Sequence, residues 1–194
     1  MDRIDYRRLL PGMDSRPLLS LYRRSIAALG DDLYSGAQRA AWARWADNTA
    51  RADEQLRQGL TVLAMANGTA VGFAQLFPGH LVNMLYVDEG WQKQGIGKGL
   101  VTRLEIVAQK QGTRTLSTRA SSASFSLFHS LGFESARQEW VHADGGITIA
   151  RTLMHKSLAP GGTADAAPAS IDDDGSTDGL IITRKGHNAP PVDQ

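Results

Sequence analysis

The sequence contains no cysteine, and no run of it is apolar over the length that a membrane span requires. The missing thiols exclude disulfides, cysteine zinc sites and thiol nucleophiles. The first residues, MDRIDYRRLLPG, have no apolar core of signal-peptide length. We therefore expect a cytoplasmic protein with no membrane partner and no metal centre.

Net charge is also nearly absent, at +1 over 194 residues, but it is unevenly distributed. Residues 1–158 carry 19 basic and 14 acidic side chains, or +5, whereas residues 159–194 carry two and six, or −4. The second segment is poor in apolar residues and rich in Gly, Pro, Ala and Asp, a composition typical of disorder. We expect one domain over 1–158 and a disordered acidic tail over 159–194. The sequence has no basic stripe with interleaved aromatics, so we expect no nucleic-acid partner.

Apolar periodicity predicts alternating helices and strands in the domain. Strands are expected at 4–10, 81–87 and 114–119, a hairpin around Asn67-Gly68, and a final hairpin from 133–142 and 147–155. Helices are expected from Asp14 or Ser15 to Gly30, from Ser35 through Trp45, at 51–58, at 95–111 and at 122–131. This order predicts a mixed α/β fold with a mostly antiparallel central sheet flanked by helices.

The segment LYVDEGWQKQGIGKGL, residues 85–100, places three glycines between a strand and a helix. The first N–H groups of a helix lack partners and bind anions, and glycine lets a phosphate approach them closely. The dinucleotide fingerprint fails here because Leu100 occupies its last glycine position, and the Walker pattern fails because Gly99 follows Lys98. A third pattern, Gln/Arg-x-x-Gly-x-Gly/Ala, is met by Gln92, Gly95 and Gly97.

With this glycine pattern, residues 82–100 resemble the acetyl-CoA motif of the GNAT N-acetyltransferase superfamily. The segment SSASFSLFHSLGF, residues 121–133, is similar to a later motif of that family, and the order of elements over 1–158 matches as well. Within the superfamily, the segment DDLYSGAQRAAWARW resembles a bacterial group of acetyltransferases. The resemblance implies a GNAT fold, in which a bulge splays the strand at 81–87 from its parallel neighbour at 114–119.

The resemblance further implies that acetyl-CoA is the acyl donor and that its arm lies in the gap between the splayed strands. Its pyrophosphate would bind the N–H groups of the glycine loop, and its pantetheine arm would pair with the backbone of the preceding strand. The cofactor-binding residues implied in this way are Leu85, Tyr86, Val87, Gln92, Lys93, Gly95, Ile96, Gly97, Lys98, Gly99 and Phe128.

The family commonly uses a tyrosine to protonate the departing thiolate, and this sequence has Phe128 at that position. Three readings follow: His129 serves instead, the thiolate leaves without a dedicated acid, or the protein binds acyl-CoA without catalysis. The strand at 81–87 carries no carboxylate, so His80, acting through a water, is the candidate base.

Aromatic residues are concentrated in the N-terminal helices, where Tyr34, Trp42 and Trp45 are candidates for the wall of the acceptor site or for the core. The function expected from the resemblance is transfer of an acetyl group from acetyl-CoA to a primary amine of a small molecule or peptide. The alternative is a non-catalytic acyl-CoA-binding module. The sequence leaves open whether the chain forms a homodimer.

Overall fold

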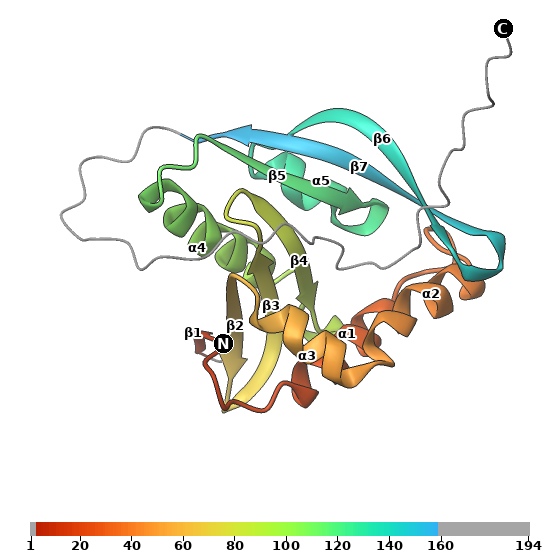
Figure 1. Cartoon of the computed structure of the whole chain (residues 1–194), viewed down its shortest axis with the longest axis horizontal. Coiled ribbons are helices and arrows are strands. Elements are labelled where there is room, and N and C mark those ends of the chain that lie inside the picture. The colour runs from red at the N-terminus through yellow and green to blue at the C-terminus, as the bar shows by residue number, and fades with distance from the viewer. Residues whose placement is uncertain (1–2, 159–194) are drawn as a thin grey trace, which may run out of the picture.

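The computed structural model describes residues 3–158, and the predicted acidic tail lies outside these residues. Figure 1 shows the elements, with helices α1 to α5 and strands β1 to β7 in chain order. They are β1 (Ile4–Arg8), α1 (Arg16–Ala27), α2 (Gly36–Ala43), α3 (Thr49–Arg57), β2 (Leu60–Ala66), β3 (Thr69–Leu76), β4 (Leu81–Val87), α4 (Ile96–Lys110), β5 (Thr115–Ser121), α5 (Ser122–Ser130), β6 (Glu134–Ala143) and β7 (Ile147–Ser157).

One seven-stranded sheet runs in the order β1-β2-β3-β4-β5-β7-β6. Every neighbouring pair is antiparallel except β4 and β5, which are parallel. The hairpin between β2 and β3 turns at Asn67 and Gly68, whose φ angles of 49° and 80° are both positive, as its two-residue turn requires. The mixed, mostly antiparallel sheet predicted from the sequence is confirmed.

Element boundaries differ from the prediction by a few residues, and side-chain capping sets two of the helix starts. Helix α2 begins with the predicted cap, because Ser35 and Gln38 form a reciprocal capping box. It ends at Ala43, so Trp45 lies in a separate short turn, η1 (Arg44–Ala46). Helix α3 begins earlier than predicted because the Asn48 side chain accepts a hydrogen bond from the Arg51 N–H.

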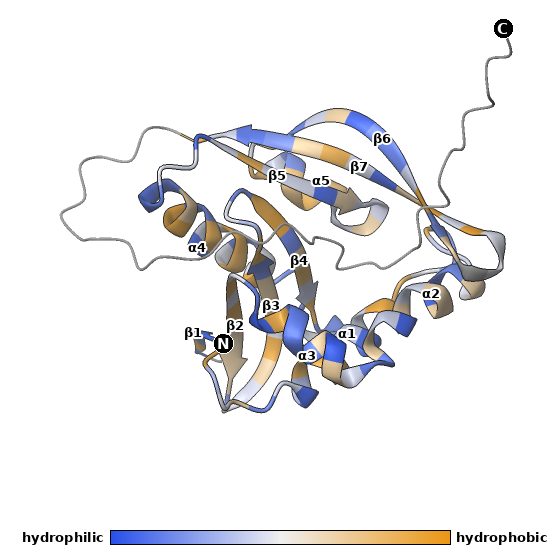
Figure 2. Ribbon diagram, in the orientation of Figure 1, coloured by the Kyte–Doolittle hydropathy of each residue, from blue (hydrophilic) through white to orange (hydrophobic). Residues whose placement is uncertain are grey.

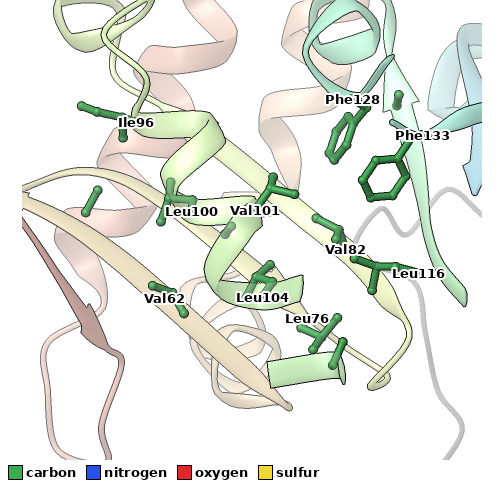
Figure 3. Close-up of a cluster of buried hydrophobic side chains, with 14 of the residues drawn as sticks. Val62, Leu76, Val82, Ile96, Leu100, Val101, Leu104, Leu116, Phe128 and Phe133 are labelled. Atoms are coloured by element: carbon green, nitrogen blue, oxygen red, sulfur yellow. The ribbon is translucent and has the colours of Figure 1, made fainter. Parts of the chain in front are cut away.

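The helices form two groups on opposite faces of the sheet, and each group has its own core. Residues of α4 and α5 pack on one face, where Figure 3 shows Leu100, Val101 and Leu104 above strand residues such as Val62. Residues of α1 and α3 pack on the other face against Phe73 and Met84. The outer edge of the sheet is more polar than the two cores, and Figure 2 shows β6 as mainly hydrophilic.

No helix within residues 3–158 is both long enough and apolar enough to cross a bilayer.

Candidate functional site

The centre of the sheet is open, because the first two residues of β4 are the ones that pair with β5. Two residue pairs join them, Leu81 with Ser117 and Val82 with Thr118, and the Thr118 hydroxyl donates to the Val82 carbonyl over 3.1 Å. Beyond that point the strands separate, and Figure 1 shows their ribbons running in clearly different directions. The splayed strand pair expected from the family resemblance is therefore present.

The separation begins at a bulge in β4. Val82 lies opposite Leu76 and Met84 lies opposite Gln75, so no residue of β3 lies opposite Asn83 in the register. The Asn83 side-chain N–H donates to Gln75 Oε1 over 3.0 Å. The Gln75 side chain, 1% exposed, in turn donates to the carbonyl oxygens of Gln55 and Gln58. A buried, fully bonded amide thus fixes the position at which β4 leaves its neighbour.

The far end of β4 is anchored to α1 and so is held on that face of the sheet. The Ser25 hydroxyl donates to the Val87 carbonyl over 3.1 Å, and Arg24 forms a 2.6 Å ion pair with Asp88 just beyond the strand. The loop side chain of Gln92 donates to the same Val87 carbonyl over 3.3 Å. These contacts keep the end of β4 away from β5.

The gap between the strands is a cavity of about 420 Å³ that reaches both faces of the sheet. Its volume lies within the range typical of small-molecule sites. The charged side chains among the described lining residues are Lys93, Lys98 and Arg119. The polar and apolar lining residues are Ser25, Ile26, Leu29, Trp42, Val82, Asn83, Leu85, Tyr86, Val87, Trp91, Gln92, Gly95, Gly97, Thr118, Ser121, Ala123, Ser124, Leu127 and Phe128.

The glycine loop opens α4 at the edge of this cavity. Gly95 is the N-cap with φ 81°, a left-handed conformation that glycine adopts without strain. The N–H groups of Ile96, Gly97 and Lys98 form the first turn of the helix, where no carbonyl lies four residues earlier within the helix. They point along the helix axis with the positive end of its dipole, so the turn is suited to bind an anion.

Gly99 has a different role from the one expected, and Ile96 has only its backbone available to the loop. The Gly99 N–H donates to the Gly95 carbonyl over 2.9 Å, so it is the first amide used within the helix. A Cβ at Gly99 would overlap the hydroxyl of Tyr6 on β1, so this glycine makes room for a packing contact. The Ile96 side chain is 2% exposed and lies in the core, so only its backbone can serve the loop.

The other expected cofactor residues lie together around the cavity. Those that line it are Leu85, Tyr86, Val87, Gln92, Lys93, Gly95, Gly97, Lys98 and Phe128. Phe128 is 2% exposed and packs edge-on against Phe133, with ring centroids 5.1 Å apart, as Figure 3 shows. The arrangement therefore brings the glycine loop, the open edge of β4 and one side of α5 to one place.

The two histidines proposed for proton transfer do not line the cavity. His80 is exposed and precedes β4 at the closed end of the gap, where its carbonyl accepts from the Ser117 N–H. His129 is exposed and stacks on Phe125 with ring centroids 6.1 Å apart. Adjacent helix positions point about 100° apart, so a buried Phe128 turns His129 away from the gap.

Of the three aromatic residues expected on the acceptor side, only Trp42 lines the cavity. Tyr34 is 3% exposed, and its hydroxyl accepts from the Ser122 N–H over 2.7 Å, which ties the loop before α2 to the start of α5. Trp45 packs on Tyr22 with ring centroids 4.7 Å apart. Tyr34 and Trp45 thus pack outside the cavity, Tyr34 against the start of α5 and Trp45 against Tyr22.

On the face of the sheet that α1 covers, two tyrosines are held in their neutral form. The Tyr22 hydroxyl donates to the Trp42 carbonyl over 2.8 Å, and the Tyr22 and Tyr86 rings lie 4.7 Å apart. Burial raises the pKa of Tyr22 well above its usual value. Burial also raises the pKa of Tyr86, although its interactions with the Trp42 and Tyr22 side chains oppose the shift. Neither phenol loses its proton near neutral pH.

A charged cluster that the sequence analysis missed extends from Arg119, on the β5 side of the cavity, onto β6 and β7. Glu139 on β6 pairs with Arg119 at 3.2 Å, Arg137 at 3.0 Å and Arg151 at 3.3 Å. Burial alone would raise the pKa of Glu139, but the three guanidinium groups lower it, so the carboxylate stays ionised. No local signal predicts the cluster, because its members come from three strands that meet only in the folded sheet.

The family model and a solved structure described below indicate the same family. The family model described as an acetyltransferase (GNAT) domain matches residues 31–158. A GCN5-related N-acetyltransferase structure from Rhodopseudomonas palustris is 32% identical, with a TM-score of 0.77 over 81% of this chain and 98% of that one. A comparison with curated proteins found no match.

Two further solved structures share the fold. The PaiA N-acetyltransferase of Thermoplasma acidophilum, in complex with coenzyme A, is 21% identical, with a TM-score of 0.62 over 80% of this chain and 99% of that one. A GNAT family acetyltransferase of Elizabethkingia anophelis, with acetyl-CoA bound, is 18% identical, with a TM-score of 0.54 over 81% of this chain and 100% of that one.

Proposed function

Because the chain belongs to the GNAT family of acetyltransferases, we propose that it transfers an acetyl group from acetyl-CoA to a primary amine by direct attack. The observation that carries this proposal is the gap between β4 and β5, which meets an anion-binding helix start at its edge. Two solved relatives hold coenzyme A or acetyl-CoA, which is the donor that this site would take.

The cofactor would occupy the α4–α5 side of the gap. The amides of Ile96, Gly97 and Lys98 would hold the pyrophosphate, with Lys93 and Lys98 adding positive charge. The pantetheine arm would run along the open edge of β4 beside Leu85 and pair with its backbone. The Val87 carbonyl is already bonded to Ser25 and Gln92, so the arm would rely on other groups of the strand.

The reaction needs few charged participants. The amine nitrogen attacks the thioester carbonyl carbon, and a backbone N–H of the open strand stabilises the resulting oxyanion. The C–S bond then breaks, the new C–N bond remains, and the nitrogen gives up a proton to water. Phe128 cannot protonate the sulfur, so coenzyme A leaves as a thiolate and is protonated by solvent, which a thiol of ordinary pKa allows.

The proposal is tested by calorimetry with acetyl-CoA and by thiol release in the presence of a panel of amines. In Gly97→Asp, the new Cβ would lie 2.9 Å from the end of the Leu127 side chain, which can rotate away, so the fold should persist. The added carboxylate would repel the pyrophosphate, and we expect at least a roughly hundredfold loss of acetyl-CoA affinity.

Gly90→Asp is the matched control, because it adds the same charge in the same loop. A Cβ at Gly90 meets no atom within 4 Å, and the residue does not line the cavity. We expect its acetyl-CoA affinity to stay within about threefold of the parent. Parent-like binding by a folded Gly97→Asp protein would show that the cofactor lies elsewhere.

The alternative function is acyl-CoA binding without catalysis, which Phe128 and the position of both histidines favour. Acetyl-CoA binding with no thiol release on any amine would support it. Phe128→Tyr separates the two cases further. A large gain in turnover would mean that an acid was missing, whereas no change would mean that the thiolate leaves unaided.

A further inference from the structure

We propose that the acceptor amine belongs to a molecule that also carries an oxyanion, a carboxylate or a phosphate, which the guanidinium of Arg119 binds. This inference rests on the proposed function and names the substrate class of the same site. It depends on where Arg119 lies, on which of its atoms are engaged, and on the charge around it.

Arg119 faces the acceptor side of the gap, opposite the cofactor side. In β5, Leu116 and Ala120 belong to the core against α4 and α5, and the strand pairs with β7 without a bulge. Side chains alternate along a strand, so Arg119 points to the other face, on which α1 lies. Arg119 also lines the cavity, as do Trp42 and Tyr86.

Part of the guanidinium is available for a ligand. Within residues 3–158, the Arg119 side chain donates through its Nε to Glu139 Oε2 over 3.2 Å. The two terminal nitrogens are not used in that bond, and the side chain is 38% exposed. Terminal guanidinium nitrogens form a planar pair of donors that suits the two oxygens of a carboxylate or phosphate.

The local charge favours an anion at this position. Glu139 is shared by Arg119, Arg137 and Arg151, so one carboxylate faces three guanidinium groups. The remaining charged side chains of the cavity are Lys93 and Lys98, at the glycine loop. A cationic second group on the acceptor would therefore meet repulsion, whereas an anionic group would be attracted.

The experiment compares amines that differ only in their second charge. The anionic probes are glycine, β-alanine and aminoethyl phosphate, the neutral probes are glycinamide and β-alaninamide, and the cationic probe is putrescine. We expect kcat/KM from thiol release to be at least about tenfold higher for the best anionic probe than for its neutral match. Comparing β-alanine with aminoethyl phosphate shows which oxyanion is preferred.

Arg119→Gln and Arg137→Gln form the matched pair of variants. Both remove a guanidinium from Glu139, but Arg137 is 67% exposed and does not line the cavity. Arg119→Gln should raise KM for the anionic probe at least about tenfold and abolish the preference over the neutral amine, whereas Arg137→Gln should preserve it. The dissociation constant for acetyl-CoA should be unchanged in both.

Several results would overturn the inference. One is a preference for putrescine or for the neutral amides. Another is an equal effect of the two variants, which would mean that Arg119 acts only on the fold. A third is loss of acetyl-CoA binding in Arg119→Gln, which would assign the guanidinium to the cofactor's phosphates.

A binding measurement separates this inference from the proposed function. Calorimetry of the anionic probes with the protein saturated by coenzyme A does not require turnover. Binding that Arg119→Gln weakens, without thiol release, would preserve the acceptor assignment and sink the transferase proposal. No binding of any anionic probe would sink the acceptor assignment, even if another amine is acetylated.

Discussion

The two walls of the central gap are built in different ways. The β4 wall belongs to the four-stranded half of the sheet, its lining residues are uncharged, and it is fixed from behind by Gln75 and Ser25. The β5 wall belongs to the three-stranded half and carries the charged residue Arg119. The β4 wall therefore suits a cofactor that is constant, whereas the β5 wall can be varied by substitution to change the acceptor.

The largest effect should come from loosening the support behind the β4 wall. Gln75→Leu would leave the Gln58 carbonyl and the Asn83 amide without their Gln75 partner, whereas the Gln55 carbonyl keeps its bond from the Gln58 N–H. At about 1–3 kcal/mol for each of these two groups, we expect a loss of about 2–6 kcal/mol. At about 2–4 °C per kcal/mol for a domain of this size, that corresponds to a fall in Tm of roughly 5–20 °C, measurable by calorimetry.

Asn83→Ala sharpens this test, because it removes only the bond at the bulge. We expect a smaller fall in Tm than for Gln75→Leu but a comparable rise in KM for acetyl-CoA, since both variants release the point at which β4 departs from β5. An unchanged KM in both variants would mean that the gap keeps its shape without this support.

An intermediate effect is expected at alkaline pH, from the tyrosines beneath the β4 wall. Tyr22 and Tyr86 have raised pKa values when folded, so they stay neutral while the unfolded chain ionises near pH 10. Their contribution to stability is complete below that pH and is lost as pH rises above it. Each group should lower the free energy of unfolding by about 1.4 kcal/mol per pH unit there.

Urea unfolding between about pH 8 and 11 measures this slope, and phenolate absorbance of the folded protein measures the ionisation directly. Tyr86→Phe should reduce the slope by the share of one group. If all four tyrosines of the chain ionise in the folded state with ordinary pKa values, the neutral pair beneath the wall does not exist.

The smallest effect is expected at the two histidines, which belong to neither wall. His80→Gln and His129→Gln should leave kcat/KM for any accepted amine within about twofold of the parent, because neither imidazole lines the cavity. A pH profile of the parent that loses its imidazole inflection in one of these variants would restore that histidine to the mechanism.

Local patterns predicted the β4 side well. The strand at 81–87 was predicted with its observed bounds, because it is an apolar run between Pro78-Gly79 and Asp88. The turn at Asn67-Gly68 and the glycine loop were also predicted from local sequence, because each depends on backbone conformations that few residues adopt.

The rest of the site depends on contacts that no local pattern contains. The role of Gly99 depends on which residue begins α4 and on Tyr6, which lies on another element. The position of His129 depends on which face of α5 is buried, and Phe128 decides it. Arg119 meets Glu139 only because β5, β7 and β6 are neighbours in the sheet.

The contact between Tyr6 and Gly99 links the outermost strand to the glycine loop. Tyr6 fits against the bare Cα of Gly99, and the Arg103 guanidinium covers its ring at 3.3 Å from the centroid. The first turn of α4 is therefore packed directly against β1. A ligand on the loop should consequently slow amide hydrogen exchange in β1, which makes the N-terminal strand a remote reporter of cofactor occupancy.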